Sequence, residues 1–318
     1  MRTDEAPREG FEGIQPGDVR VSHADVGGPL AEVMSGDFGA HLPHGMVREA
    51  GRLTRYTLNR PVAGIRKAIG SFVGRKDLQA KPGTLFAYSL AIALRDLDDE
   101  AFTELGRGGL VHGSDGRAKV ADLALKVARL CVGDVLRLVV AYQATHAPDG
   151  LVVAGGSCES CRREIGRVQV QLGDAVPLRV FSPAVCAERP ARAWVGLYSP
   201  IVLPDGREVR ALELAPPTWW SVFWNAAPED FANPAALLIA QVVGSVVGTD
   251  VLGVSTLTPA DVEMCFEPRD CELIDDALEE ICPTPVFGVA VTCPHCQKVN
   301  QIDINWLDPG FFKRASAG

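Results

Sequence analysis

Two Cys-x-x-Cys pairs constrain the fold of this chain more than any other feature of its sequence. The second pair, Cys293-Pro294-His295-Cys296, lies near the C-terminus. Residues 301–306 after it alternate polar and apolar side chains, and residues 286–291 before it also suit a strand. The pair is therefore predicted to lie at the turn of a β-hairpin. Such a hairpin is the usual half of a zinc ribbon, because two thiolates at this spacing can face one tetrahedral ion.

The same four-residue spelling is compatible with a thiol-disulfide oxidoreductase. In such enzymes the first cysteine begins a helix, whose positive end lowers the pKa of the thiol. The residues that follow Cys296 alternate with the period of a strand and do not resemble a helix. A redox role for Cys293 and Cys296 stays open as an alternative to metal binding.

Cys158-Glu159-Ser160-Cys161 repeats this arrangement, with an apolar approach and an alternating strand at residues 168–172. The two pairs are separated by far more than the roughly 15 to 20 residues of an ordinary zinc ribbon. The entropy of loop closure grows only logarithmically with length, so a long insertion costs little more than a short one. Two separate sites, or one site shared between chains, remain open. The leading prediction is one zinc site with four ligands: Cys158, Cys161, Cys293 and Cys296.

The similarity between the two halves extends upstream of the cysteines. Each pair is preceded, in the same order, by Leu-Pro-x-Gly, a polar turn, a short alternating strand, a proline and helical segments. The strands are predicted at residues 53–58 and 209–214, and an alanine- and leucine-rich helix is predicted after each, at 85–98 and 235–250. We infer an old tandem duplication. The predicted fold class is α+β, with two related units that each contain a β-hairpin plus helices and end in a zinc-knuckle hairpin.

This repeat predicts the organisation of the chain. Residues 1–35 are expected to be a flexible N-terminal arm, residues 36–175 the first α+β unit with its knuckle, and residues 176–318 a second, shorter unit with its knuckle. Two core helices are expected between residues 120 and 142, divided at Gly133-Asp134, and an amphipathic helix at 271–281.

Composition narrows the class of protein. No apolar run reaches the roughly 18 to 20 residues of a membrane span, and the charged N-terminal residues lack the apolar region of a signal peptide. Nine cysteines without a secretory signal favour a reducing cytoplasm, where C-x-x-C indicates metal or catalysis before a structural disulfide. We therefore expect a cytoplasmic protein without a membrane partner. The cysteines outside the two pairs are expected to be buried small hydrophobic residues: Cys131, Cys186, Cys265, Cys271 and Cys282.

No catalytic motif accompanies the cysteines. A phosphate loop, a nucleophile elbow and an H-E-x-x-H zinc motif are all absent from the sequence. A zinc ion with four protein ligands has no open position for water, so it organises a fold and catalyses nothing. We expect no catalytic residue, no small-molecule substrate and no cofactor other than zinc.

Charge is distributed unevenly along the chain. The formal net charge is −9, yet residues 48–81 contain nine basic side chains and only two acidic ones, Glu49 and Asp77. Such a segment is typical of a solvated face, a contact with an acidic protein, or a nucleic-acid site. The acidic total makes nucleic acid the less expected partner. The basic side chains are Arg48, Arg52, Arg55, Arg60, Arg66, Lys67, Arg75, Lys76 and Lys81.

The order of these features resembles a known family. The chain contains, in this order, Leu42-Pro43-His44-Gly45 with its hairpin, helices, a helix from Asp134 through Tyr142, and Cys158-x-x-Cys161 followed by a strand. This order resembles the baseplate-associated and tail-assembly proteins of contractile phage tails and phage-tail-like injection systems. The resemblance covers residues 36–175 and, more loosely, the C-terminal knuckle. It implies a structural or assembly role without catalysis, other baseplate or tail subunits as partners, and incorporation into a phage-like particle.

Three function classes follow from the sequence. A structural or assembly protein of a contractile tail-like particle is the first. A zinc-ribbon nucleic-acid-binding protein is the alternative, supported by the basic segment and opposed by the acidic total charge. A thiol-disulfide oxidoreductase that uses Cys293 and Cys296 is the third.

Overall fold

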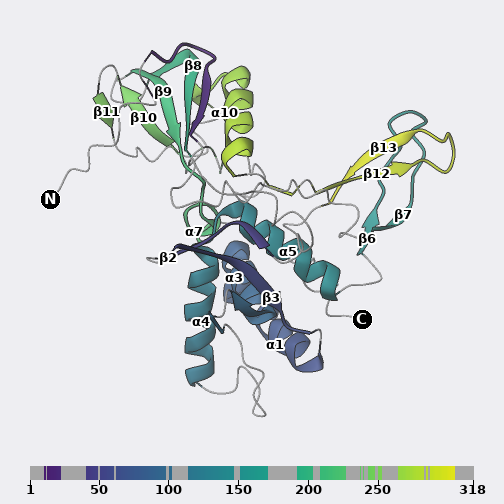
Figure 1. Cartoon of the computed structure of the whole chain (residues 1–318). Helices are drawn as coiled ribbons and strands as arrows, with labels where there is room; N and C mark the ends of the chain where they lie inside the picture. Colours follow the sequence, from purple (N-terminus) through teal and green to yellow (C-terminus); the bar gives the residue numbers. More distant parts are fainter. Residues whose placement is uncertain are drawn as a thin grey trace, which may run out of the picture.

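A computed structural model describes residues 11, 13–22, 41–48, 51–60, 62–97, 100–101, 114–146, 151–170, 192–202, 208–226, 237, 239, 243–247, 250–252, 264–282, 284–285 and 287–304, and all structural statements below concern these residues. Within them, seven helices and four antiparallel sheets form a mixed α+β protein (Figure 1). The predicted α+β class is confirmed. None of these helices is long and apolar enough to cross a lipid bilayer.

The first half of the chain forms a four-stranded sheet and a helical core. The strand order of the sheet is β2 (His41–Arg48), β3 (Gly51–Leu58), β4 (Leu94–Leu97) and β5 (Glu100–Ala101). The helices are α1 (Ala63–Val73), α2 (Lys76–Gln79), α3 (Pro82–Ala93), α4 (Ser114–Ala128) and α5 (Val132–His146). The predicted strand at 53–58 is confirmed as part of β3. Leu42–Gly45 lies within β2, where the pairing with β3 shifts between His41 and Met46.

Helix α3 lies at the centre of the helical core. It contains no charged residue, and every side chain except Tyr88 is buried, as expected for a helix that is apolar on all sides. The predicted helix at 85–98 is wrong beyond Ala93, because residues 94–97 form β4 and pair with β3. Asn59 stabilises this change of structure, since its buried side-chain amide donates to the carbonyl oxygens of Ile92 and Leu94 at 3.0 and 3.2 Å.

The two predicted core helices are confirmed as α4 and α5. The break between them lies at residues 129–131, before the predicted Gly133-Asp134, and Asp134 falls in the first turn of α5. This break is bonded to a distant segment: the Val132 amide donates to the Pro217 carbonyl oxygen, and the Trp219 amide donates to that of Leu130, both at 2.9 Å. The backbone of residues 217–219 therefore fixes the corner between α4 and α5.

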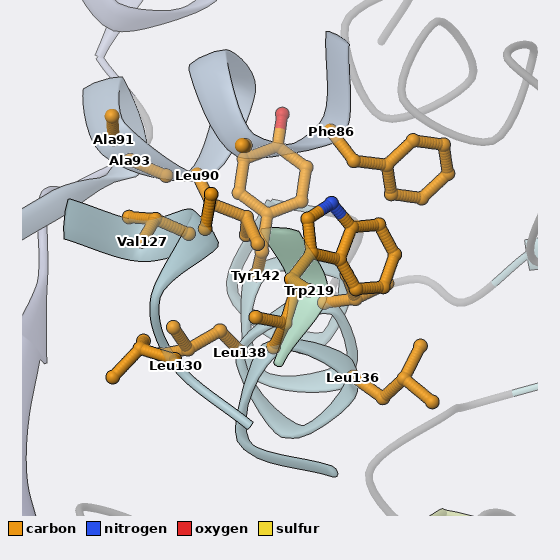
Figure 2. Close-up of a cluster of buried hydrophobic side chains, with 14 of the residues drawn as sticks. Phe86, Leu90, Ala91, Ala93, Val127, Leu130, Leu136, Leu138, Tyr142 and Trp219 are labelled. Atoms are coloured by element: carbon orange, nitrogen blue, oxygen red, sulfur yellow. The ribbon is translucent and has the colours of Figure 1, made fainter. Parts of the chain in front are cut away.

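Trp219 begins the short helix α7 (Trp219–Val222) and enters the helical core (Figure 2). Its side chain is fully buried, between Phe86 and Phe223, and its indole N–H donates to the carbonyl oxygen of Gly83 at 2.8 Å. A Cβ on Gly83 would collide with the carbonyl oxygen of Phe223, so only glycine permits this approach of α7 to α3. The second half of the chain thus contributes a tryptophan to the core of the first.

A five-stranded sheet with one covering helix forms a second core. Its order is β1 (Val19–Ser22), β8 (Arg192–Val202), β9 (Glu208–Leu214), β10 (Val243–Val247) and β11 (Asp250–Leu252), and α10 (Pro268–Ile281) packs against β8 and β1 (Figure 1). The predicted strand at 209–214 and the predicted helix at 271–281 are confirmed. Residues 19–22 of the predicted N-terminal arm form β1.

The predicted helix at 235–250 is wrong over residues 243–247. Residues 237 and 239 are helical, but Val243–Val247 is strand β10, hydrogen-bonded to β9 on one side and β11 on the other. Three of the five residues of β10 are valine. Valine is β-branched, and β-branched side chains pack well on a pleated sheet. Pairing with β9 decides the structure here, and that pairing has no signature in the local sequence.

The tandem duplication stays a prediction. Both predicted hairpins form, but β2–β3 belongs to a four-stranded sheet and β8–β9 to a five-stranded one. The unit boundaries at 35/36 and 175/176 also stay predictions. Contacts cross the second boundary at Trp219 in the helical core, at the paired cysteines, and where β1 pairs with β8.

Candidate metal centre

The two cysteine pairs lie at the tips of two hairpins that face each other (Figure 1). The first hairpin is β6 (Leu151–Ala154) with β7 (Arg167–Val170), and the second is β12 (Gly288–Thr292) with β13 (Val299–Asp303). The predicted hairpin context of both pairs is confirmed, since each pair lies between two antiparallel strands. Neither pair begins a helix, the position that activates a redox thiol.

The structure brings the four predicted ligands into one cluster. All four Sγ atoms lie within 4.8 Å of one another, and the contacts between the hairpins include Cys158 with Cys296, at 3.6 Å, and Cys161 with Cys293, at 3.8 Å. Four sulfur atoms on a tetrahedron around a zinc ion at 2.3 Å would be about 3.8 Å apart. The spacing of these thiols is therefore compatible with one four-coordinate metal ion.

The two cysteine turns have the same backbone geometry. In the first, the Cys158 amide donates to the Arg163 carbonyl oxygen and the Arg162 amide donates back to Cys158, at 2.8 and 2.9 Å. The second repeats this with Cys293, Lys298 and Gln297, at 2.8 and 3.0 Å. Arg162 and Gln297 occupy equivalent positions and both have φ of +60°, a left-handed conformation that closes each turn. The local likeness seen in the sequence thus reflects equivalent metal knuckles.

Hydrogen bonds prepare one of the thiols to ionise. The backbone N–H of Cys161, with further help from that of Ser160, the Cys296 thiol and Asn300, lowers the pKa of Cys158 to about 6. At Cys296, the backbone N–H of Lys298 acts to lower the pKa, but burial and the neighbouring thiols together raise it to about 11. Thiolates packed this closely repel one another, so a divalent cation is what allows all four to ionise together.

A small apolar core supports the cluster. Cys158 and Cys293 are fully buried with Ile165 from the first hairpin and Ile302 from the second, and further valines of both hairpins pack around them. Gly155 lies between β6 and the first cysteine turn. Its amide donates to the Gly166 carbonyl oxygen at 2.6 Å, and a Cβ on Gly155 would lie 2.7 Å from the same oxygen. The four thiols and this core together join the two hairpins.

Asn300 connects the two hairpins, and the sequence reasoning did not single it out. Its side chain is buried, its carbonyl oxygen accepts from the Glu159 amide at 2.9 Å, and its NH₂ group donates to the Lys298 carbonyl oxygen at 2.9 Å. Asn300 shares the inward face of β13 with Ile302, whereas Val299 and Gln301 are exposed. The sequence signal for Asn300 was a polar residue at an inward-facing position of a strand that alternates polar and apolar residues.

Replacing Asn300 with alanine is expected to lower the free energy of unfolding by about 0.5–1.5 kcal/mol, because the Glu159 amide loses its acceptor and the Lys298 carbonyl oxygen loses one of its two donors. Urea unfolding of the metal-loaded protein would measure the change. Gln301→Ala is the matched control, since Gln301 is the next residue of β13 and is exposed. Equal stability of the two variants would contradict this role of Asn300.

The remaining cysteines lie outside the cluster. Cys282 is buried and Cys131 and Cys271 are half-buried, broadly as predicted, but Cys265 is exposed, so the prediction is wrong for that residue. Burial, then the charges of Asp275, Asp270 and Glu272, raise the pKa of the Cys271 thiol. Cys186 lies outside the described residues.

Comparison with known proteins finds no family model, no curated protein and no solved structure that matches this chain. The class of this protein is therefore defined by its fold and its candidate site alone. The chain is a mixed α+β protein whose two cysteine hairpins form a four-thiol cluster suited to a metal ion.

Proposed function

We propose that the chain is a structural or assembly component of the baseplate of a contractile tail-like particle, and that zinc stabilises it. The observation that carries the proposal is the cluster of four cysteine thiols within 4.8 Å, which fills a tetrahedral coordination sphere with protein ligands. A metal held in this way has no position left for a substrate or an activated water. Its role is to hold chain segments together.

The two cysteine hairpins, β6–β7 and β12–β13, which we call the ribbon, need such a metal. The core of the ribbon consists of four buried residues, two of which are cysteines, and this is far less apolar surface than an independent domain requires. Four-thiolate tetrahedral sites select zinc or iron, and zinc is the ion that adds no redox chemistry. Zinc binding can supply on the order of 10 kcal/mol of folding free energy in small zinc peptides.

The baseplate assignment rests on the resemblance described from the sequence. The elements that carry it are all formed in the expected order: the β2–β3 hairpin, helices α1 to α4, helix α5 with Asp134 in its first turn, and the knuckle between β6 and β7. A protein of this kind acts through its surfaces, as a rigid body with fixed sites for neighbouring subunits.

Affinity purification of the tagged full-length chain from its host would test the proposal. We expect tail tube, sheath or baseplate subunits to be recovered with the wild-type chain and to be lost with Cys293→Ser, because the C-terminal hairpin is then no longer held. Recovery of the chain without any tail subunit, from cells that contain assembled particles, would contradict a structural role in them.

A nucleic-acid-binding zinc ribbon is the second candidate. Four exposed cations lie on the ribbon, against two exposed carboxylates, Glu159 and Glu164. Binding to a DNA duplex that weakens by a factor of about 10³ or more between about 50 and 200 mM salt would favour this function over the first. The cations are Arg162, Arg163, Arg167 and Lys298.

A further inference from the structure

An aromatic stack runs from the helical core to the surface. The ring of Phe72 in α1 stacks on Tyr88 in α3, at 5.2 Å between centroids; Tyr88 is followed by Trp224 at 6.4 Å, and Trp224 by Trp220 at 4.9 Å. Phe72 is buried, whereas Trp220 is 45% exposed, so the outer end of the stack faces solvent. Arg75 lies over the Phe72 ring at 5.8 Å.

Three exposed lysines lie in α1, in α2 and directly before α3, along the segment that carries Phe72 and Tyr88 of this stack. Lys76 follows Arg75 directly, and Lys81 precedes the first turn of α3, where Thr84 donates to the Trp224 carbonyl oxygen at 2.5 Å. Lys67 lies on the exposed side of α1. None of these three lysines has a carboxylate partner among the described residues. We call Lys67, Lys76, Lys81, Trp220 and Trp224 the basic-aromatic face.

Helix α10 presents the opposite charge. Its buried side faces the five-stranded sheet, and its other side exposes four carboxylates at the spacing of one helix face: Glu272, Asp275, Asp276 and Glu280. We call these four residues the acidic face. Partial desolvation, and after it the charges of Asp276 and Glu279, raise the pKa of Asp275 above its ordinary value, although its side chain remains exposed. Met264, four residues before the start of α10, is 85% exposed and places an apolar side chain on the segment that leads into this helix.

The two faces lie on different parts of the molecule. In Figure 1, α10 lies beside the five-stranded sheet at the top, whereas α1 lies at the bottom, with α5 and α7 between them. The chain carries a net charge of −9, so two copies repel each other except where a basic surface meets an acidic one. The lysines match the carboxylates in charge, and the exposed Trp220 ring suits the thioether of Met264, since sulfur packs favourably against aromatic rings.

We propose that the basic-aromatic face of one copy binds the acidic face of a second copy, so that chains associate head to tail. A contact between two different faces leaves one of each free on the pair, and it therefore builds a ring or a filament. This inference deepens the structural role proposed above and rests on it for its place in a particle. Its test uses the purified chain alone, so its failure would leave the co-purification result standing.

Sedimentation velocity on the metal-loaded full-length protein tests the proposal. We expect concentration-dependent association at about 50 mM salt that weakens at about 200 mM salt, because exposed charge pairs are screened. A wild-type chain that sediments as a monomer across the concentration series at the lower salt overturns the proposal. Binding of single-stranded DNA by such a monomer, lost in Lys76→Glu/Lys81→Glu, would instead assign the face to nucleic acid.

Charge reversal makes the contact specific. Lys76→Glu/Lys81→Glu and Asp275→Lys/Asp276→Lys should each weaken self-association by about tenfold or more, since like charges then meet. An equimolar mixture of the two variants should regain it, because each reversed face finds its complement. Unchanged melting temperature and metal content show that both variants fold. Association that survives either reversal, or a mixture that fails to associate, overturns the proposed pairing.

Trp220→Ala separates the aromatic contribution from charge. We expect it to weaken association several-fold without altering the salt dependence, because the exposed ring supplies apolar contact area and no charge. Val152→Ala is the matched control, since Val152 is 49% exposed on the first cysteine hairpin and belongs to neither face. Equal self-association of the two variants would show that Trp220 is not part of the contact.

Discussion

Cys293→Ser is expected to release the metal and to open the paired hairpins, while the two larger cores stay folded. The serine hydroxyl does not replace a thiolate as a zinc ligand, and the ribbon core of four buried residues cannot hold the hairpins alone. The helical core and the five-stranded sheet have their own buried clusters and should remain. The expected loss of stability in the ribbon is several kcal/mol, of the order seen when small zinc domains lose their metal.

Two measurements check this result. Elemental mass spectrometry should find one zinc per wild-type chain and none in the variant, and hydrogen exchange should show lost protection in β6, β7, β12 and β13. Cys158→Ser should have the same effect, because the site needs both pairs. Cys265→Ser is the matched control, an exposed cysteine outside the cluster. Unchanged zinc content in Cys293→Ser, or a reversible Cys293–Cys296 disulfide in a zinc-free wild type, would contradict the metal centre.

Trp219→Ala is expected to lower the free energy of unfolding by about 3–5 kcal/mol, the range typical of removing a fully buried aromatic side chain. The indole is fully buried among the helices, and its removal leaves a cavity and deletes the hydrogen bond to the Gly83 carbonyl oxygen (Figure 2). The corner between α4 and α5 also depends on the backbone of this segment. Urea denaturation followed by circular dichroism would measure the loss.

The neighbouring residue provides the control for Trp219. Trp220→Ala removes the same side chain from the same helix, but at a position that is 45% exposed, so its cost should be well under half as large. Trp219→Phe should cost less than alanine because the ring partly fills the site while the hydrogen bond is lost. Similar destabilisation by Trp219→Ala and Trp220→Ala would show that the segment does not anchor the core through Trp219.

The candidate site was predictable from short-range patterns. The spacing of Cys158 with Cys161 and of Cys293 with Cys296, with alternating strands after each pair, was enough to predict two hairpins and one shared cluster. These features are local because a metal knuckle is built from a few consecutive residues. The meeting of the two pairs was predicted from chemistry, since half a tetrahedral site requires another half.

The rest depended on contacts between distant residues. Strand β10 was predicted as helix because alanine, leucine and valine in sequence do not reveal that β9 lies alongside. The entry of Trp219 into the core depends on Gly83, whose lack of a side chain gives no sequence pattern of its own. Asn300 forms one of its two side-chain bonds across the two hairpins, to Glu159, which is 141 positions away. The baseplate role stays a proposal on the strength of short motifs.

The separation of the two cysteine pairs has a consequence during synthesis of the chain. Cys161 and Cys293 are 132 residues apart, so at the roughly 5–20 residues per second of translation the first knuckle emerges about 7 to 26 seconds before the second. During that time only half of the coordination sphere exists. A four-ligand site can therefore close only after Cys293 and Cys296 have been synthesised, and a chain that stops before them carries at most two of the four thiols.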